Sequence, residues 1–183
     1  TAKIEPIVAA FIGTNYNKNF EKFALIDASK YELSEYNLFS PNKFSGIDYH
    51  DYGKRFSYGI NGSFLFEQYY LNVFLGQLIY QNNINTKGNK DYVGSSSIDI
   101  ANNLKLYYRF RKDQKLNPIR DEVGVTTTSK KLTTSLSFSK LNNISKYYSD
   151  DGLIFPENKV SQITLNIGYQ ILESLRVDTG TQF

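Results

Sequence analysis

The sequence predicts an all-β fold, an antiparallel meander of about nine long strands of the kind that forms a transmembrane β-barrel. Three observations predict this fold. Apolar and polar residues alternate with a period of two, the alternating stretches are about ten residues long, and the aromatic residues are 15 Tyr and 13 Phe without Trp. Soluble strands are commonly ~5–6 residues long, whereas a tilted strand needs ~9–11 to cross the hydrocarbon layer. Strand length therefore favours a membrane barrel over a soluble sandwich.

The alternation is clearest over residues 54–65, where Phe56, Tyr58 and Ile60 oppose Arg55 and Ser57. Successive side chains of a strand point to opposite faces, so this stretch has one apolar and one polar face. Similar or weaker alternation predicts the other strands, which in chain order are Ile4–Ile12, Tyr69–Tyr80, Tyr92–Ala101, Asn103–Arg111, Ile119–Thr128, Leu132–Ser139, Gln162–Ile171 and Leu175–Thr181.

The connections between these strands carry turn-forming residues and differ in length. Short reversals are expected near Asn102 and at Ser129, because Asn, Ser and Lys favour turns there. Longer connections are expected over residues 14–51 and 140–157. Short turns on one side and long loops on the other are usual in outer-membrane barrels. We expect residues 1–183 to form one barrel segment without a linker.

Composition excludes several classes of function. The 21 basic and 18 acidic residues are scattered along the chain, so no nucleic-acid surface is indicated. There is no Cys and one His, His50, which lies in a Tyr- and Asp-rich stretch, so we expect no zinc site, no cofactor and no catalytic residue. No run of ~18 apolar residues is present that could cross a membrane as a helix. The protein is expected not to be an enzyme.

Four basic residues alternate with apolar neighbours and would face the lumen of a barrel, because a charge on the lipid face at mid-bilayer costs ~2–4 kcal/mol. They are Arg55, Lys105, Arg109 and Arg111. Two interpretations stay open. They are ordinary lumen charges balanced by acids, namely Asp99, Asp121 and Glu122. Alternatively, they form an electropositive inner wall that attracts an anionic lipid headgroup.

Several segments together resemble the barrel domain of the LptD family, the organic solvent tolerance proteins. Lys3–Val8 is similar to a strand that begins L-E-P, and Gly53–Gly59 is similar to the entry G-x-R-x-x-Y-G. Between them, the sequence is similar to the family patterns N-L-F and R-F-S-G-x-D, with Lys43 in place of the Arg, in a family-like loop containing Asn37, Leu38, Phe39, Phe44, Gly46 and Asp48. Phe74–Gln77 and Leu106–Arg111 continue the match in order.

This resemblance implies part of a large outer-membrane barrel that delivers lipopolysaccharide (LPS) to the outer leaflet. It implies LPS, outer-membrane lipid, an LptE-like lipoprotein plug and an LptA-like periplasmic bridge protein as partners. The bridge protein would bind an N-terminal domain that, like the signal peptide and the remaining strands, we expect to lie outside these residues. The loop from Phe39 to Asp48 is expected to pack against the barrel or its plug.

Two alternatives stay open. The chain could be a complete small porin or adhesin barrel, although the residues before Phe183 make a poor closing strand. It could instead be a soluble periplasmic lipocalin-like binder, which predicts that its apolar faces point inward. Mean hydropathy, at −0.42, does not separate these classes, because every other residue of a membrane strand is polar.

Overall fold

The computed structural model describes residues 1–12, 33–41, 54–81, 89–101, 103–142, 159–172 and 175–183. Within these residues the regular structure consists of nine strands, which confirms the predicted all-β class. The strands are β1 (Ala2–Ile12), β2 (Lys54–Leu65), β3 (Tyr69–Gln81), β4 (Asn89–Ile100), β5 (Leu104–Lys112), β6 (Pro118–Thr128), β7 (Leu132–Asn142), β8 (Lys159–Leu172) and β9 (Leu175–Gln182).

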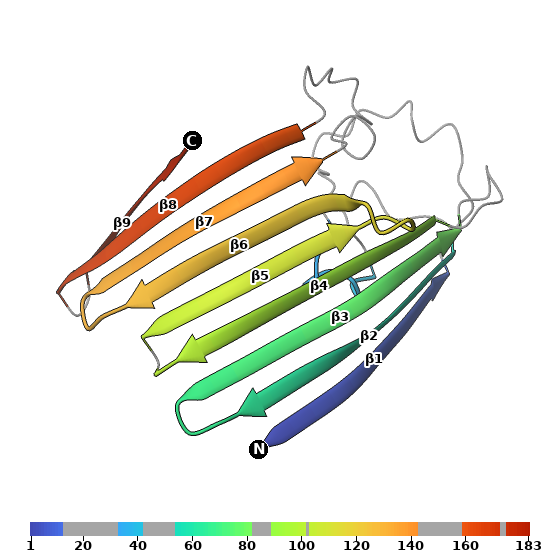
Figure 1. The fold of residues 1–183 in the computed structure, drawn as a ribbon, viewed down its shortest axis with the longest axis horizontal. Coiled ribbons are helices and arrows are strands. Elements are labelled where there is room, and N and C mark those ends of the chain that lie inside the picture. Colours follow the sequence, from blue (N-terminus) through green and yellow to red (C-terminus); the bar gives the residue numbers. More distant parts are fainter. Residues whose placement is uncertain (13–32, 42–53, 82–88, 102, 143–158, 173–174) are drawn as a thin grey trace.

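The strands form one sheet in sequence order, and every neighbouring pair is antiparallel (Figure 1). Strands β1 and β9 are the two edges of this sheet, and among the described residues they do not pair with each other. The structure therefore shows an open meander of the type expected for part of a barrel wall.

The connections alternate in length along the chain, as the sequence predicts. Residues 66–68, 101–103, 129–131 and 173–174 join strands at one end of the sheet, which we call the short-turn end. Residues 13–53, 82–88, 113–117 and 143–158 join strands at the opposite end, the long-connection end (Figure 1).

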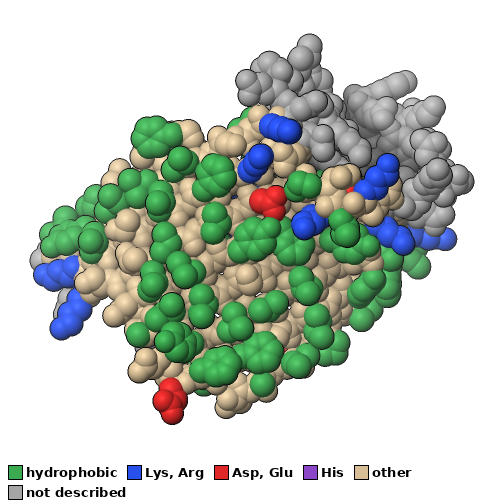
Figure 2. Space-filling model, viewed as in Figure 1, with side chains coloured by type: hydrophobic (Ala, Val, Ile, Leu, Met, Phe, Trp, Pro, Cys, Tyr) green, Lys and Arg blue, Asp and Glu red, His purple; other side chains and the backbone are tan. Residues whose placement is uncertain are grey.

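Alternation gives the sheet two different faces. We define the apolar face by exposed and half-buried hydrophobic side chains from eight of the strands: Ile4, Val8, Phe56, Ile60, Leu75, Ile98, Leu106, Val123, Leu136, Phe138, Ile163 and Ile167. Several of these have more than two-fifths of their surface exposed, for example Val8 at 65% and Val123 at 52%. Figure 2 shows hydrophobic side chains spread across this face, with other side chains and backbone between them. An exposed apolar surface of this breadth marks contact with another apolar phase or molecule.

The opposite face, the polar face, carries the intervening side chains. Its members include Arg55, Ser57, Asn72, Asp91, Ser95, Arg109, Glu122, Ser137 and Asn166. Residues 33–41 lie on this face, behind the sheet in the view of Figure 1. The polar face is therefore the place to look for a functional site. No helix among the described residues is long and apolar enough to span a membrane.

The reversal between β5 and β6 depends on Asp113. Its Oδ1 accepts hydrogen bonds from the backbone N–H groups of Lys115, at 2.8 Å, and Asn117, at 2.9 Å, and its Oδ2 accepts one from the Asn117 side-chain amide at 3.1 Å. Replacing Asp113 by Ala should destabilise the protein by ~1–3 kcal/mol, because three part-buried hydrogen bonds to a charged acceptor are lost. Asp113→Asn, which retains one acceptor oxygen, should cost less. The midpoint of heat-induced loss of the folded band on electrophoresis measures both, and an unchanged midpoint for Asp113→Ala would contradict this role.

Candidate functional site on the polar face

Residues 33–41 form a compact segment whose own hydrogen bonds define its shape. Asn37 accepts a hydrogen bond from the Ser34 N–H on its Oδ1 at 2.8 Å, and its carbonyl accepts one from the Ser40 N–H at 3.1 Å. Asn side chains commonly close turns in this way. The Asn of the family-like loop therefore has a local structural role.

The apolar side chains of the segment dock on the middle of the polar face. Leu38 is completely buried, and Leu33 is 5% exposed. They pack with Phe74, Leu78 and Val93 from β3 and β4, which form the buried hydrophobic cluster of the described residues. The segment therefore shields Phe74, Leu78 and Val93 from water, although most other side chains on this face of the sheet are polar.

Two glycines make room for this docking. Gly59 on β2 and Gly76 on β3 are directly paired and share the polar face. A Cβ atom at Gly76 would overlap the Leu38 side chain, and one at Gly59 would lie 3.2 Å from the Phe39 ring. The Phe39 ring also meets the Phe74 ring edge-on, with centroids 6.1 Å apart. Gly59 and Gly76 thus form a shallow floor for Leu38 and Phe39.

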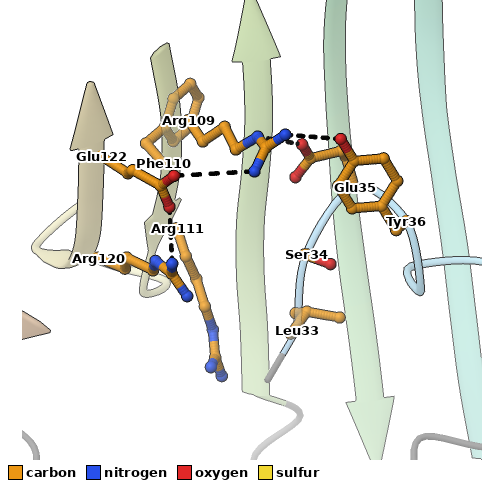
Figure 3. Close-up of a pocket in the computed structure, with 9 residues that line it drawn as sticks. All are labelled: Leu33, Ser34, Glu35, Tyr36, Arg109, Phe110, Arg111, Arg120 and Glu122. Atoms are coloured by element: carbon orange, nitrogen blue, oxygen red, sulfur yellow. Dashed lines mark hydrogen bonds and ion pairs between the residues drawn. The ribbon is translucent and has the colours of Figure 1, made fainter. Parts of the chain in front are cut away.

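Arg109 fixes the other side of the segment by charge (Figure 3). Its Nε lies 2.9 Å from the Glu35 carboxylate, and its Nη2 donates a 2.6 Å hydrogen bond to the Tyr36 hydroxyl. The Glu35 side chain is 11% exposed, so this ion pair is shielded more than a surface pair. The guanidinium also lies over the Tyr107 ring, 4.9 Å from its centroid.

Glu122 on β6 connects this contact to a wider network. It lies 3.8 Å from Arg109, 2.6 Å from Arg120, and accepts a 3.1 Å hydrogen bond from the Tyr107 hydroxyl. A cavity of about 220 Å³ adjoins the network, and both the segment and β5–β6 line it (Figure 3). The anionic and cationic groups around the cavity already pair with one another. We therefore interpret the cavity as a gap in the packing between the segment and strands β5 and β6.

The four predicted basic residues all lie on the polar face, and each has an anionic or carbonyl partner. Arg55 donates to the Pro41 carbonyl at 2.6 Å, Lys105 lies 3.8 Å from Asp99, and Arg111 lies 2.7 Å from Asp91. The balance by Asp99 and Glu122 agrees with the ordinary-charge interpretation.

The predicted role of Asp121 is wrong, because alternation places this residue on the apolar face. There its carboxylate accepts a 2.7 Å hydrogen bond from the Tyr108 hydroxyl. Glu35 and Asp91 balance the arginines in its place. Alternation predicts the face of Asp91, but nothing local in the sequence predicts that Glu35 and Tyr36 reach β5.

The remaining predicted residues divide between the described and undescribed parts. Asn37, Leu38 and Phe39 belong to the docked segment. Phe44, Gly46, Asp48 and His50 lie outside the described residues, so their placement stays a prediction. Within the described residues no three His, Cys, Asp or Glu side chains gather as metal ligands would.

Fold and polar face together define a class of protein: a segment of β-barrel wall that is apolar on one face and carries a docked inner segment on the other. The family model described as LPS transport system D, LptD, matches residues 1–175. A similar protein is the LPS-assembly protein LptD of Aliivibrio fischeri, 27% identical over 150 residues, or 79% of this chain. The chain belongs to the LptD family. The aligned region spans 19% of the length of that relative.

Arg109→Ala should loosen the Glu35–Tyr36 side of the segment while leaving the sheet and the Leu38 contact intact, because Glu35 and Tyr36 lose their partner on β5. Limited proteolysis of the purified intact protein, read by mass spectrometry, should show faster cleavage within residues 33–41. The matched control is Lys105→Ala, which removes a basic residue from the same strand and face that pairs only weakly, at 3.8 Å, with Asp99. A cleavage rate for Arg109→Ala no faster than that of the unaltered protein and of Lys105→Ala would contradict the anchoring role.

Proposed function

We propose that this chain forms part of the wall of an outer-membrane β-barrel that assembles LPS into the outer leaflet. The apolar face would contact membrane lipid, and the polar face would line the lumen. The observation that carries this proposal is the continuous apolar face, which is exposed across strands of 8–14 residues. Antiparallel pairing satisfies the backbone polar groups between neighbouring strands, as a wall inside hydrocarbon requires.

The open edges fit this assignment. Strands β1 and β9 would pair with further strands of a longer barrel, in keeping with the length of the family relative. The lipocalin-like alternative is not favoured, because it requires the apolar side chains to be enclosed, whereas here they are exposed. A complete small barrel is not favoured either, because the nine strands form an open sheet.

The docked segment would act as a fixed lining of the lumen. Leu38 and Phe39 hold it to β2 and β3, and Arg109 holds it to β5, so it would narrow the lumen without moving as a free loop. Tyr36, which is 76% exposed, is the part of the segment that would face a lipoprotein plug of the LptE kind. A periplasmic bridge protein of the LptA kind would act outside these residues. We also propose that the chain has no enzymatic activity, since its role is to guide a lipid.

A pair of adjacent substitutions on β7 tests the orientation. Leu136 lies mid-strand on the apolar face, and Ser137 is the next residue on the polar face. Leu136→Lys in the intact protein should cost ~2–4 kcal/mol of folding stability in a bilayer, because the charge would enter hydrocarbon. Ser137→Lys should be tolerated, because its ammonium would reach lumen water.

The measurements are folding equilibrium in lipid vesicles and, in cells, exclusion of a large antibiotic as a readout of surface LPS. We expect Leu136→Lys to lower both and Ser137→Lys to lower neither. Equal tolerance of the two lysines would overturn the membrane assignment. Impaired folding of Leu136→Lys in vesicles together with unaltered antibiotic exclusion in cells would overturn the transport assignment alone.

A further inference from the structure

The apolar face carries lysines at its long-connection end. Five strands contribute one each, at positions that alternate in phase with the apolar side chains of the same strand. They are Lys54 on β2, Lys90 on β4, Lys112 on β5, Lys140 on β7 and Lys159 on β8. We call this set the lysine rim. Figure 2 shows basic side chains near the ends of this face and apolar side chains between them.

The register places these lysines at a nearly common level of a tilted sheet. Neighbouring strands are ~4.8 Å apart and tilt by ~35–45° to the axis of a barrel. Residues at the same depth in the membrane are therefore displaced by about one residue along each successive strand, relative to the residues that are paired across the strands. Lys54 pairs with Gln81, whereas Lys90, two strands away, pairs with Ile79, a shift of two residues. Across the next pair of strands, Lys112 is opposite Tyr92, two residues beyond Lys90. From Lys54 to Lys140 the lysines therefore shift along the strands in the direction that a fixed level requires, whereas Lys159, opposite Asn142, lies two residues nearer the long-connection end than Lys140.

The ion pairs between described residues lie on the polar face and not at the rim. No ion pair among the described residues involves any of its five lysines. The acid closest in register is Asp121, which is opposite Lys140 on the neighbouring strand. Lys112 extends along the apolar surface, with its ammonium 5.3 Å from the centroid of the Phe110 ring. A long apolar stem with a charged head suits the boundary between hydrocarbon and headgroups.

We propose that the lysine rim binds the phosphate groups of LPS in the outer leaflet while the acyl chains of the same molecules lie on the apolar face. This inference rests on the proposed function. It places the long-connection end at the cell surface, because outer-membrane barrels have short periplasmic turns and longer extracellular loops. Lysines near a membrane surface attract anionic headgroups. LPS is the source we favour, because it is the lipid of the leaflet at that end and carries several phosphates, so one molecule could engage lysines of neighbouring strands.

The test uses the intact purified protein in non-ionic detergent, with lipid A as the probe and binding read by native mass spectrometry. The variant replaces Lys112, Lys140 and Lys159 together by Gln. The matched control replaces Lys130 and Lys131, which lie in the turn at the opposite end, by Gln. A second variant replaces the three rim lysines by Arg, which keeps the charge.

We expect the rim variant to bind lipid A at least tenfold more weakly, since each lysine near a surface contributes on the order of fivefold. The turn control and the Arg variant should bind as the unaltered protein does. Lipid A without phosphates should bind weakly to all of them. Unchanged binding by the rim variant, equal binding of phosphate-free lipid A, or equally tight binding of phosphatidylglycerol would overturn the proposal.

Failure of this inference is distinguishable from failure of the proposed function. If the rim is unimportant, Leu136→Lys still destabilises the inserted protein and Ser137→Lys still does not. If the membrane assignment itself is wrong, the two β7 variants behave alike whatever the lysine rim binds.

Discussion

Backbone hydrogen bonding is the constraint on which this structure depends. A strand in hydrocarbon has no water to satisfy its N–H and C=O groups, so each strand has to pair with its neighbours along its length. The nine strands do this through long antiparallel ladders, eleven residue pairs for β1 with β2. Once the ladders are formed, successive side chains point to opposite faces of the sheet. One face can then contact an apolar environment while the other contacts water.

Part of the polar face is covered by residues 33–41 and is not exposed to water. This explains why the alternation of apolar and polar residues is lost on β3. On β3 both faces carry apolar side chains, because Phe74 and Leu78 point toward residues 33–41 while Leu75 points the opposite way. The segment acts as a second apolar surface over the sheet. Its position is over-determined, since Gly76 admits Leu38 and Arg109 binds Glu35 from another strand.

Much of the fold could be predicted from the sequence. The period of two locates β2 at the residues where it is observed, and the long ladder lengths follow from the alternating stretches. It also predicts the faces of Arg55, Lys105, Arg109 and Arg111, because face depends only on parity within a strand. Asp121 shows the limit of using charge alone: the same parity places it on the apolar face, where the Tyr108 hydroxyl is its partner.

Other parts of the site could not be predicted, because they depend on contacts between residues distant in the sequence. Arg109 and Tyr36 are separated by 73 positions, and no periodicity encodes their 2.6 Å hydrogen bond. The contact of Leu38 and Phe39 with Gly59 and Gly76 could not be predicted either. A glycine in a strand indicates a close approach or a bend, but the sequence does not show what approaches Gly59 and Gly76. The resemblance to the family loop marks the segment as notable without giving its docking site.

The central claim is that one face of this sheet contacts lipid and the other contacts lumen water. A spin label attached to single introduced cysteines at successive positions from 132 to 139 of β7, in the intact protein reconstituted in vesicles, tests it most directly. Access to oxygen, which concentrates in hydrocarbon, should rise at even positions, while access to a water-soluble nickel chelate should rise at odd positions. Profiles that do not alternate, or that rise at the same positions for both reagents, would contradict it.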